Sequence, residues 1–110
     1  MSPRLWQERI EDIIEAIAEI QTFIQPMTFE RFVDDPKTIK AVALNVIVIG
    51  EAAANVPDDV VNAHPEIAWH LMRGMRNRLV RDYFGMDPQV IWETAKHDLP
   101  PLVESLRNVL

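Results

Sequence analysis

Four arginines crowd into nine consecutive positions of this 110-residue chain, and they are its first candidates for chemistry. They are Arg73, Arg76, Arg78 and Arg81, and Asp82 supplies the one carboxylate of the segment. Like charges three positions apart on a helix repel one another, so the cluster carries a local cost unless an anion offsets it. Guanidinium groups bind carboxylates and phosphates through paired hydrogen bonds. The segment therefore predicts either a solvated basic face or an anion site, for a carboxylate from elsewhere in the chain or for a phosphate.

The order of residues in this segment resembles the signature of the HEPN superfamily, and in particular that of the HepT-like toxins. Their signature is an arginine, four residues, a histidine, one residue and a tyrosine. Arg76, Arg81 and Tyr83 stand at those three positions, and Asn77 follows the first. The likeness extends along almost the whole chain, through Gly50-Glu51-Ala52-Ala53, Trp69, Met75, Leu79-Val80, Trp92 and Leu99-Pro100-Pro101-Leu102. An arginine–asparagine pair alone is common, whereas this ordered set is specific.

The resemblance implies an all-α, HEPN-type bundle of four to five helices that forms a homodimer, with the signature residues meeting across the dimer cleft. It implies the toxin of a type II toxin–antitoxin system, which cleaves RNA, such as a tRNA or an mRNA, without a metal or other cofactor. The implied partner is a cognate minimal nucleotidyltransferase (MNT-type) antitoxin that neutralises the toxin by transferring AMP. Arg76 would bind the scissile phosphate, Asn77 would support it, and Tyr83, the sole tyrosine, would accept AMP.

Position 81 departs from the pattern, because Arg81 stands where the signature has histidine. When RNA is cleaved by its own 2′-hydroxyl, that hydroxyl needs a proton acceptor and the leaving oxygen needs a proton donor. Imidazole suits both roles near neutral pH, whereas guanidinium stays protonated and only stabilises phosphate charge. Loss of an acid–base group costs about 10²–10⁴-fold in rate. We therefore expect the pair Arg76 and Arg81 to be inactive or severely weakened as a nuclease site.

Two explanations for Arg81 stay open: a substitution made so that a toxic protein could be produced, or a natural chain that has lost catalysis. The function also has an alternative, which is a non-catalytic HEPN module that docks a nucleotidyltransferase or RNA. A plain helical dimerisation protein is a third hypothesis. A nucleotidyltransferase gene next to this one would favour the ribonuclease toxin and the non-catalytic HEPN module over the dimerisation protein. Substitution of Arg81 by histidine would then separate the toxin from the non-catalytic module.

The histidines and other polar residues give less support to different chemistries. His64 precedes a proline at an expected helix start, which is typical of a surface or capping residue, whereas His70 and His97 are the alternative acid–base groups. Carboxylate and imidazole side chains nowhere show the spacing of a metal site, and the two serines are terminal, which leaves a serine triad without support. Core or dimer contacts, rather than base stacking, are expected for Trp6, Trp69 and Trp92.

Helix start signals and apolar periodicity predict the elements that position the arginines. Ser2-Pro3 and Asp35-Pro36 each combine a capping side chain with a first-turn proline, and isoleucines between Ile10 and Ile24 recur at a helical period. Pro65-Glu66 opens the helix that carries the arginines, and Gly85 ends it. The predicted helices cover residues 3–25, 36–55, 67–83, 89–97 and 102–110, with short helical turns over 28–33, capped by Thr28, and over 58–63.

One stretch is ambiguous, since Val42–Ile49 is rich in β-branched residues and by propensity alone resembles a buried strand. Helix is favoured by the start signal at Asp35-Pro36 and by the alanines that continue beyond Gly50. The chain also offers no second convincing strand, and a lone strand leaves its backbone groups without partners.

Composition sets the outer limits. Residues 1–110 suit one domain with a single core, because 48% of them are apolar and 25% are charged. The net charge of −6 argues against a general nucleic-acid coat and makes the arginines a basic spot on an acidic body. The absence of cysteine, of a leader-like start and of an apolar run of about 20 residues predicts a cytoplasmic protein without membrane contact.

Overall fold

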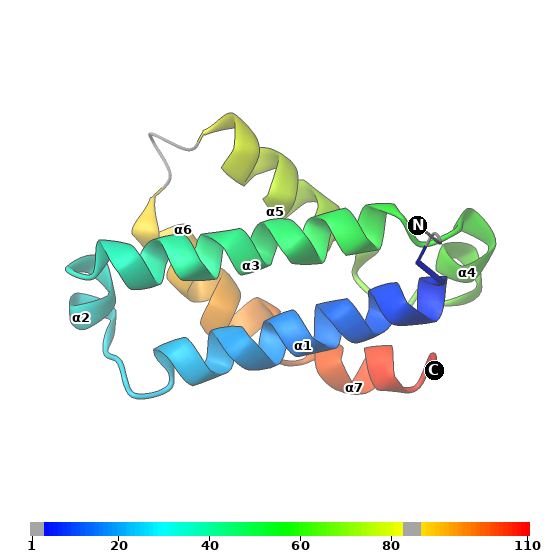
Figure 1. Ribbon diagram of the computed structural model, residues 1–110, viewed down its shortest axis with the longest axis horizontal. Helices are drawn as coiled ribbons and strands as arrows, with labels where there is room; N and C mark the ends of the chain where they lie inside the picture. Colours follow the sequence, from blue (N-terminus) through cyan, green and yellow to red (C-terminus); the bar gives the residue numbers. More distant parts are fainter. Residues whose placement is uncertain (1–3, 83–86) are drawn as a thin grey trace.

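The computed structural model describes residues 4–82 and 87–110, and all regular structure within those two ranges is helical. The two longest helices, α1 and α3, run antiparallel and side by side along the 41 Å length of the molecule (Figure 1). The expected all-α fold is confirmed, and the two short turns appear as α2 and α4. The helices are α1 (Trp6–Ile24), α2 (Phe29–Val33), α3 (Pro36–Ala54), α4 (Asp58–Ala63), α5 (Trp69–Arg81), α6 (Pro88–Glu93) and α7 (Leu102–Arg107), with a π-helical turn η1 (Thr94–Asp98) after α6.

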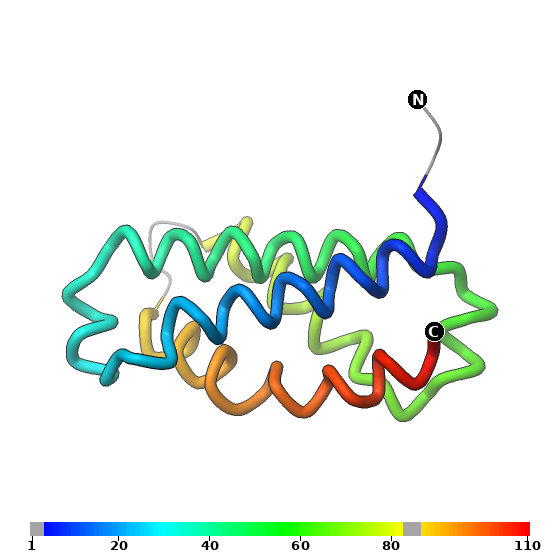
Figure 2. Tube along the Cα trace, turned by 60° about the horizontal axis from the view of Figure 1, so that its bottom comes forward, coloured from blue at the N-terminus to red at the C-terminus, as the bar shows by residue number. Residues whose placement is uncertain are grey.

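The remaining helices cover two sides of the α1–α3 pair. α5 crosses α3 on the side away from α1 (Figure 1), whereas α7 lies along α1 and ends near the beginning of that helix (Figure 2). α6 and η1 connect these sides and pack against α2, α3 and α1. The arginine helix α5 is therefore attached to the bundle mainly through α3. Within the described residues, no helix is both long and apolar enough to cross a bilayer.

The core follows from the helical period of the apolar residues. Ile10, Ile13 and Ile17 of α1 are fully or almost fully buried, as the periodicity predicts, while Ile14 is only partly buried. α3 turns Val46 and Ile49 into the same core. Because an α-helix makes about three turns in 11 residues, this spacing keeps one face of each helix apolar. Burial of each of these side chains contributes about 1.5–3 kcal/mol to the stability of the fold.

Capping side chains start the helices at three of the expected places. The Thr28 hydroxyl accepts from the Arg31 N–H at 3.2 Å, and an Asp35 carboxylate oxygen accepts from the Thr38 N–H at 3.1 Å. Asp87 likewise accepts from the Gln89 N–H at 2.9 Å and is followed by Pro88 in the first turn of α6. Val42–Ile49 lies within α3, so the helix was the correct alternative for that stretch.

Two helix starts were predicted too early. α1 begins at Trp6, not at Pro3: its first turn is stabilised by the Glu8 carboxylate, which accepts from the Leu5 N–H at 3.1 Å, and Ser2 and Pro3 lie outside the described residues. α5 begins at Trp69, not at Ile67. Its N-cap is Ala68, and the preceding turn is closed by the Trp69 indole N–H, which donates to the His64 carbonyl at 3.0 Å.

Helix ends also differ from the expected ones. α5 ends at Arg81, two residues before the predicted end at Tyr83, and Asp82 already has non-helical backbone angles. α7 ends at Arg107 instead of Leu110. The expected helix over 89–97 is present but changes to π-helical geometry from Thr94 to Asp98. Gly85, the expected end signal of α5, lies outside the described residues.

Candidate active site on α5

The crossing of α3 and α5 is built around a residue without a side chain. Gly50 is buried in α3, and a Cβ atom placed there would collide with Arg76 Cβ and lie 2.8 Å from the carbonyl oxygen of Met72. Only glycine lets the two backbones come this close. The position of Arg76 relative to α3 is therefore set by backbone packing at Gly50.

The Arg76 guanidinium is held by two side chains. Its Nη2 atom forms an ion pair with Oε1 of Glu51, the residue after Gly50 on α3. Its Nη1 atom donates to Oδ1 of Asn77 at 2.7 Å. The Arg76 and Glu51 side chains are 37% and 48% exposed, so the pair lies at the surface and is open to an incoming anion. The sequence predicted that the arginines bind either a carboxylate from elsewhere in the chain or a phosphate. For Arg76 such a carboxylate is present, and it is that of Glu51.

Two guanidinium nitrogens of this segment are buried without a hydrogen bond. They are Nε of Arg73 and Nε of Arg76, for which the described residues supply no acceptor. Buried polar atoms in proteins are normally paired, so these two unpaired N–H donors are exceptions to that rule. Arg73 lies three residues before Arg76, which places the two side chains on neighbouring positions of one helix face.

Arg81 is placed quite differently. Its side chain is 73% exposed, and its nearest ion-pair partner is the adjacent Asp82, with Arg81 Nε and Asp82 Oδ1 3.8 Å apart. Five residues separate it from Arg76, which is about 140° around an α-helix. The two signature positions of this chain therefore face different sides of α5, Arg76 toward α3 and Arg81 toward solvent.

Tyr83, the expected AMP acceptor, lies outside the described residues. The predicted helix over residues 67–83 would have placed Tyr83 about two turns beyond Arg76 and on the same face of the helix. Since α5 ends at Arg81, that helical argument does not apply.

The opposite side of α5 borders a groove of about 430 Å³ toward α6 and η1. Leu71, Met75 and Val90 contribute to its walls, and His70, Arg78 and Asp98 to its polar lining. His70, one of the alternative acid–base groups, thus borders a space between helices. Within the part of the chain that the structure describes, no group of three His, Asp or Glu side chains is arranged to hold a metal ion.

The other two histidines are surface residues. His64 Nδ1 lies 3.3 Å from a Glu66 carboxylate oxygen. His97 Nε2 lies 3.4 Å from Oε2 of Glu93, and the His97 side chain is 69% exposed. Neither of these contacts involves a residue of the arginine cluster.

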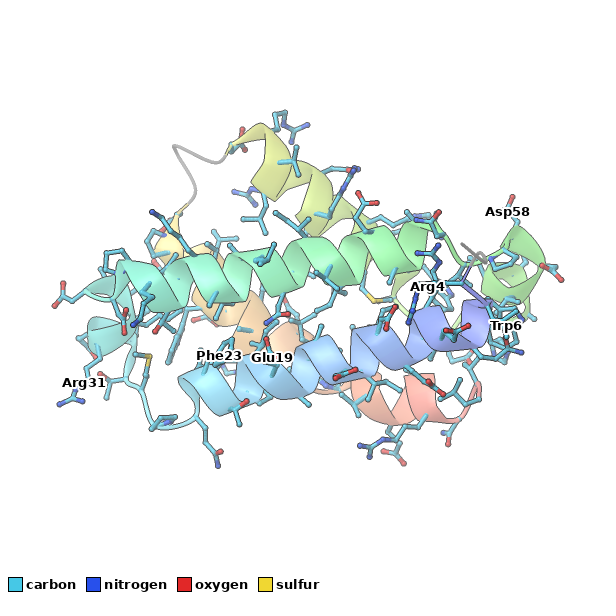
Figure 3. All side chains as sticks on the ribbon, in the orientation of Figure 1. Arg4, Trp6, Glu19, Phe23, Arg31 and Asp58 are labelled. Carbon is cyan, nitrogen blue, oxygen red and sulfur yellow. The ribbon has the colours of Figure 1, made fainter. Side chains whose placement is uncertain are left out.

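Two of the tryptophans belong to the core, as expected. Trp69 and Trp92 are buried, and the Trp92 ring packs on Phe32 with their centroids 5.1 Å apart. Trp6 is partly buried at the start of α1, at the same end of the molecule as Arg4 and Asp58 (Figure 3). The buried rings are thus unavailable as stacking platforms for bases.

Comparison with known proteins identifies the family. The model of the HepT-like ribonucleases matches residues 13–109, which is most of the chain. The chain belongs to the HepT-like ribonuclease family. Among its HepT-like relatives is a protein of Thermococcus cleftensis named "Probable ribonuclease HepT", which is 44% identical over 99 residues, or 90% of each chain.

Two further HepT-like relatives carry names that assign them to the RNases. One, from Methanocaldococcus jannaschii, is 35% identical over 90% of this chain and 82% of its own length. The other, from Caldanaerobacter subterraneus subsp. tengcongensis, is 32% identical over 99% of this chain and 95% of its own. No solved structure shows significant similarity to this HepT-like chain.

Glu51 is the residue of the site that sequence reasoning missed. It was noticed only as part of the family likeness, because its partner lies 25 positions away and on another helix. A usable signal was the glycine before it, since glycine inside a helix is costly and often marks a close approach of another backbone.

Proposed function

We propose that this HepT-like chain is the toxin subunit of a type II toxin–antitoxin system. The activity it inherits from its family would be metal-independent endoribonuclease activity, and Arg81 would disable catalysis in this chain. The observation that carries the proposal is the contrast at the signature: Arg76 is oriented by two side chains, while position 81 presents an exposed guanidinium. Membership of the family supports RNA as the substrate.

The chemistry of RNA cleavage explains the assigned roles. The Arg76 guanidinium would bind the scissile phosphate and stabilise the negative charge that grows on it as the 2′-oxygen attacks phosphorus. Asn77 would keep that guanidinium in place through its side-chain hydrogen bond. The proton of the 2′-hydroxyl has to be accepted and the 5′-oxygen has to be protonated, and the Arg81 guanidinium performs neither step near neutral pH.

Surface apolar residues support a homodimer. Leu44 and Val48 share one face of α3 with Glu51, and Val80 shares one face of α5 with Asn77 and lies beside Arg76. Leu44 and Val80 are 62% and 51% exposed, although both are large apolar side chains. Exposed apolar residues around an ion pair are typical of an interface. The resemblance to the HEPN toxins implies that position 81 of one chain would then meet Arg76 of the other across the dimer cleft.

The partner of the toxin would be a cognate minimal nucleotidyltransferase, in the cytoplasm, and Tyr83 would accept AMP from it. Tyr83 follows Arg81 by two positions in the signature. AMP attached there would bring a negative phosphate next to an arginine cluster, and guanidinium groups bind phosphate bidentately. The modification would thereby occupy the place of the RNA phosphate.

Arg81 also favours a second candidate, a non-catalytic HEPN module that docks a nucleotidyltransferase or RNA. Four guanidinium groups can bind phosphate without any acid–base group. Such a module would keep the Arg76 site for binding and would have no use for histidine at position 81.

The substitution Arg81→His separates the two candidates. If only the acid–base group is missing, it should raise RNA cleavage by about 10²–10⁴-fold, in the presence of EDTA, and should make expression toxic. A further Arg76→Ala should abolish both effects. Arg78→His is the matched control, because it places a histidine on the same helix three residues earlier and should give no activity. Failure of Arg81→His to gain activity would favour the binding module.

Assembly is tested by sedimentation at tens of micromolar. The proposal expects a dimer, and Val80→Glu should shift it toward the monomer, since it places a charge in the apolar part of the surface. A monomeric wild-type protein would contradict the composite site.

Modification is tested with the cognate nucleotidyltransferase and ATP. Intact mass spectrometry should show AMP-sized increments that Tyr83→Phe removes. Equal labelling of Tyr83→Phe would show that the acceptor is another hydroxyl.

A further inference from the structure

We infer that Glu51 is a positioning residue, which fixes the Arg76 guanidinium so that it presents its remaining N–H donors to a phosphate. The inference deepens the proposed function, because it concerns the same phosphate site. It starts from the ion pair between Glu51 Oε1 and Arg76 Nη2, which links α3 to α5 beside the Gly50 crossing.

The donors of Arg76 can be followed one by one. A guanidinium carries five N–H groups in a rigid plane. One on Nη2 is directed to Glu51 and one on Nη1 to Asn77 Oδ1. The other N–H on each of these nitrogens remains available, whereas the N–H on Nε is buried, with no acceptor among the described residues. A phosphate can therefore bind while both side chains keep their contacts.

Two contacts on different nitrogens fix the plane of the group. A single contact would leave the guanidinium free to rotate about that bond, whereas Glu51 and Asn77 hold both ends. Since Cβ of Arg76 is packed against Gly50, the base of the side chain is fixed as well. A preorganised donor loses less entropy when it binds the phosphate, and it keeps its geometry as charge develops in the transition state.

Stability alone does not account for this carboxylate. Both partners are about half exposed, and surface ion pairs contribute little to the free energy of folding. A carboxylate next to a phosphate site also repels the substrate. Its benefit must then lie in the orientation of Arg76, and its removal should reduce the rate of cleavage more than the binding of RNA.

The first experiment follows the Arg76 guanidinium by NMR in the otherwise wild-type protein, with Arg76→Lys to assign its signals. Held guanidinium groups give separate Nη–H resonances, and these should be present for Arg76 and average together in Glu51→Gln. Glu8→Gln is the matched control, because Glu8 on α1 is also a half-exposed glutamate, and it is paired with an arginine, Arg4, that precedes the helix. It should leave the Arg76 signals unchanged. Arg76 signals that are already averaged, or that ignore Glu51→Gln, would overturn the inference.

The second experiment measures cleavage and binding in the Arg81→His background. Glu51→Gln should lower kcat by about tenfold or more, since small misplacements of a positioned group are that costly, while Kd for an uncleavable 2′-O-methyl RNA changes less than about threefold. Glu51→Asp should restore part of kcat, and Glu8→Gln should change neither value. An unchanged kcat, or an unchanged kcat with much tighter RNA binding, would identify Glu51 as a bystander or a competitor of phosphate and would overturn the inference.

The two experiments fail separately. If Arg81→His shows no cleavage, the proposed nuclease function fails, and the NMR result still decides whether Glu51 positions Arg76. If Arg81→His cleaves RNA and Glu51→Gln cleaves it equally fast, the proposed function stands and the positioning role is wrong.

Discussion

α3 and α5 cross at Gly50, yet they are built in opposite ways. α3 begins with a capping carboxylate, Asp35, and packs on α1, α2, α5 and α6. α5 begins at Trp69, its N-cap residue Ala68 provides no side-chain cap, and the helix packs mainly on α3. Val46 and Ile49 of α3 belong to the apolar core, whereas α5 exposes Arg78 and Arg81.

This difference separates two tasks. α3 supplies a fixed backbone and one carboxylate, and α5 presents the charged groups. Arg76 lies where the two helices meet and is oriented by both. Arg81 lies at the far end of α5, and within residues 4–82 and 87–110 its one ion-pair partner is the adjacent Asp82. The orientation of the Arg76 guanidinium thus depends on α3, which supplies Gly50 and Glu51, as much as on α5, which carries Arg76 itself.

The strongest test of the comparison is Gly50→Ala. The added methyl group would collide with Arg76 Cβ and approach the Met72 carbonyl to 2.8 Å, so the helices must separate. Overpacking of this kind costs about 1–3 kcal/mol, and a backbone obstacle places Gly50→Ala at the upper end. Urea denaturation should show the loss, and RNA cleavage by Gly50→Ala in the Arg81→His background should fall with it.

Gly74→Ala on α5 is the control for that prediction. Nothing lies within 4 Å of a Cβ atom at position 74, which is an exposed position inside the helix. Alanine there should stabilise the protein by about 0.5–1 kcal/mol, because glycine loses more backbone entropy on folding. If both substitutions changed stability by the same amount and sign, the two helices would not differ in the way described.

The start of α5 gives a smaller effect. Trp69→Phe removes the indole donor to the His64 carbonyl, the hydrogen bond that closes the turn before the helix. The hydrogen bond contributes about 1 kcal/mol, and the smaller ring adds a packing loss of similar size. Trp92→Phe is the control for packing, since the Trp92 ring is similarly buried and is held by Phe29 and Phe32. Chemical denaturation should show a larger loss in the free energy of unfolding for Trp69→Phe than for Trp92→Phe. Equal losses would show that the hydrogen bond from Trp69 to the His64 carbonyl does not stabilise the protein.

The start of α3 gives the smallest effect, and it depends on pH. The Thr38 backbone N–H, and then the Thr38 hydroxyl, hold the pKa of Asp35 below its ordinary value. A carboxyl whose pKa is lowered by folding stabilises the protein above its unfolded pKa, near 3.9, and loses that contribution as pH falls through the lower folded value. Asparagine also caps helices but does not titrate. The difference in unfolding midpoint between wild type and Asp35→Asn should therefore be larger at pH 7 than at pH 3, and a constant difference would contradict the cap's charge dependence.

Most of α3 could be predicted from sequence because its signals are local. Asp35-Pro36 marks its start, and the alanines beyond Gly50 decide helix over strand. The start of α5 was misplaced because proline favours both a first helical turn and the turn before a helix. Pro65 lies in the turn before α5, and this turn is closed by the hydrogen bond from the Trp69 indole to the His64 carbonyl. Helix propensity, which considers residues one by one, does not include that hydrogen bond.

The site shows the same limit. Arg76 and Asn77 could be found because the signature lies in one continuous segment. Glu51 could not be paired with Arg76, because the pairing depends on where two helices cross. Orientation was equally hidden, because the spacing of five residues does not by itself show that Arg76 pairs with a residue of α3 while Arg81 is exposed to solvent.

The two buried tryptophans also give the molecule optical probes on both sides of the signature. Trp69 lies at the first residue of α5, and Trp92 lies in α6, with the Lys96 ammonium 5.1 Å from its ring centroid. Indole emission shifts to longer wavelength when water reaches the ring. Variants that lack Trp6 and keep only one of the two buried tryptophans would therefore report by fluorescence, in real time and without a label, whether an anion at the arginines loosens α5, α6 or neither.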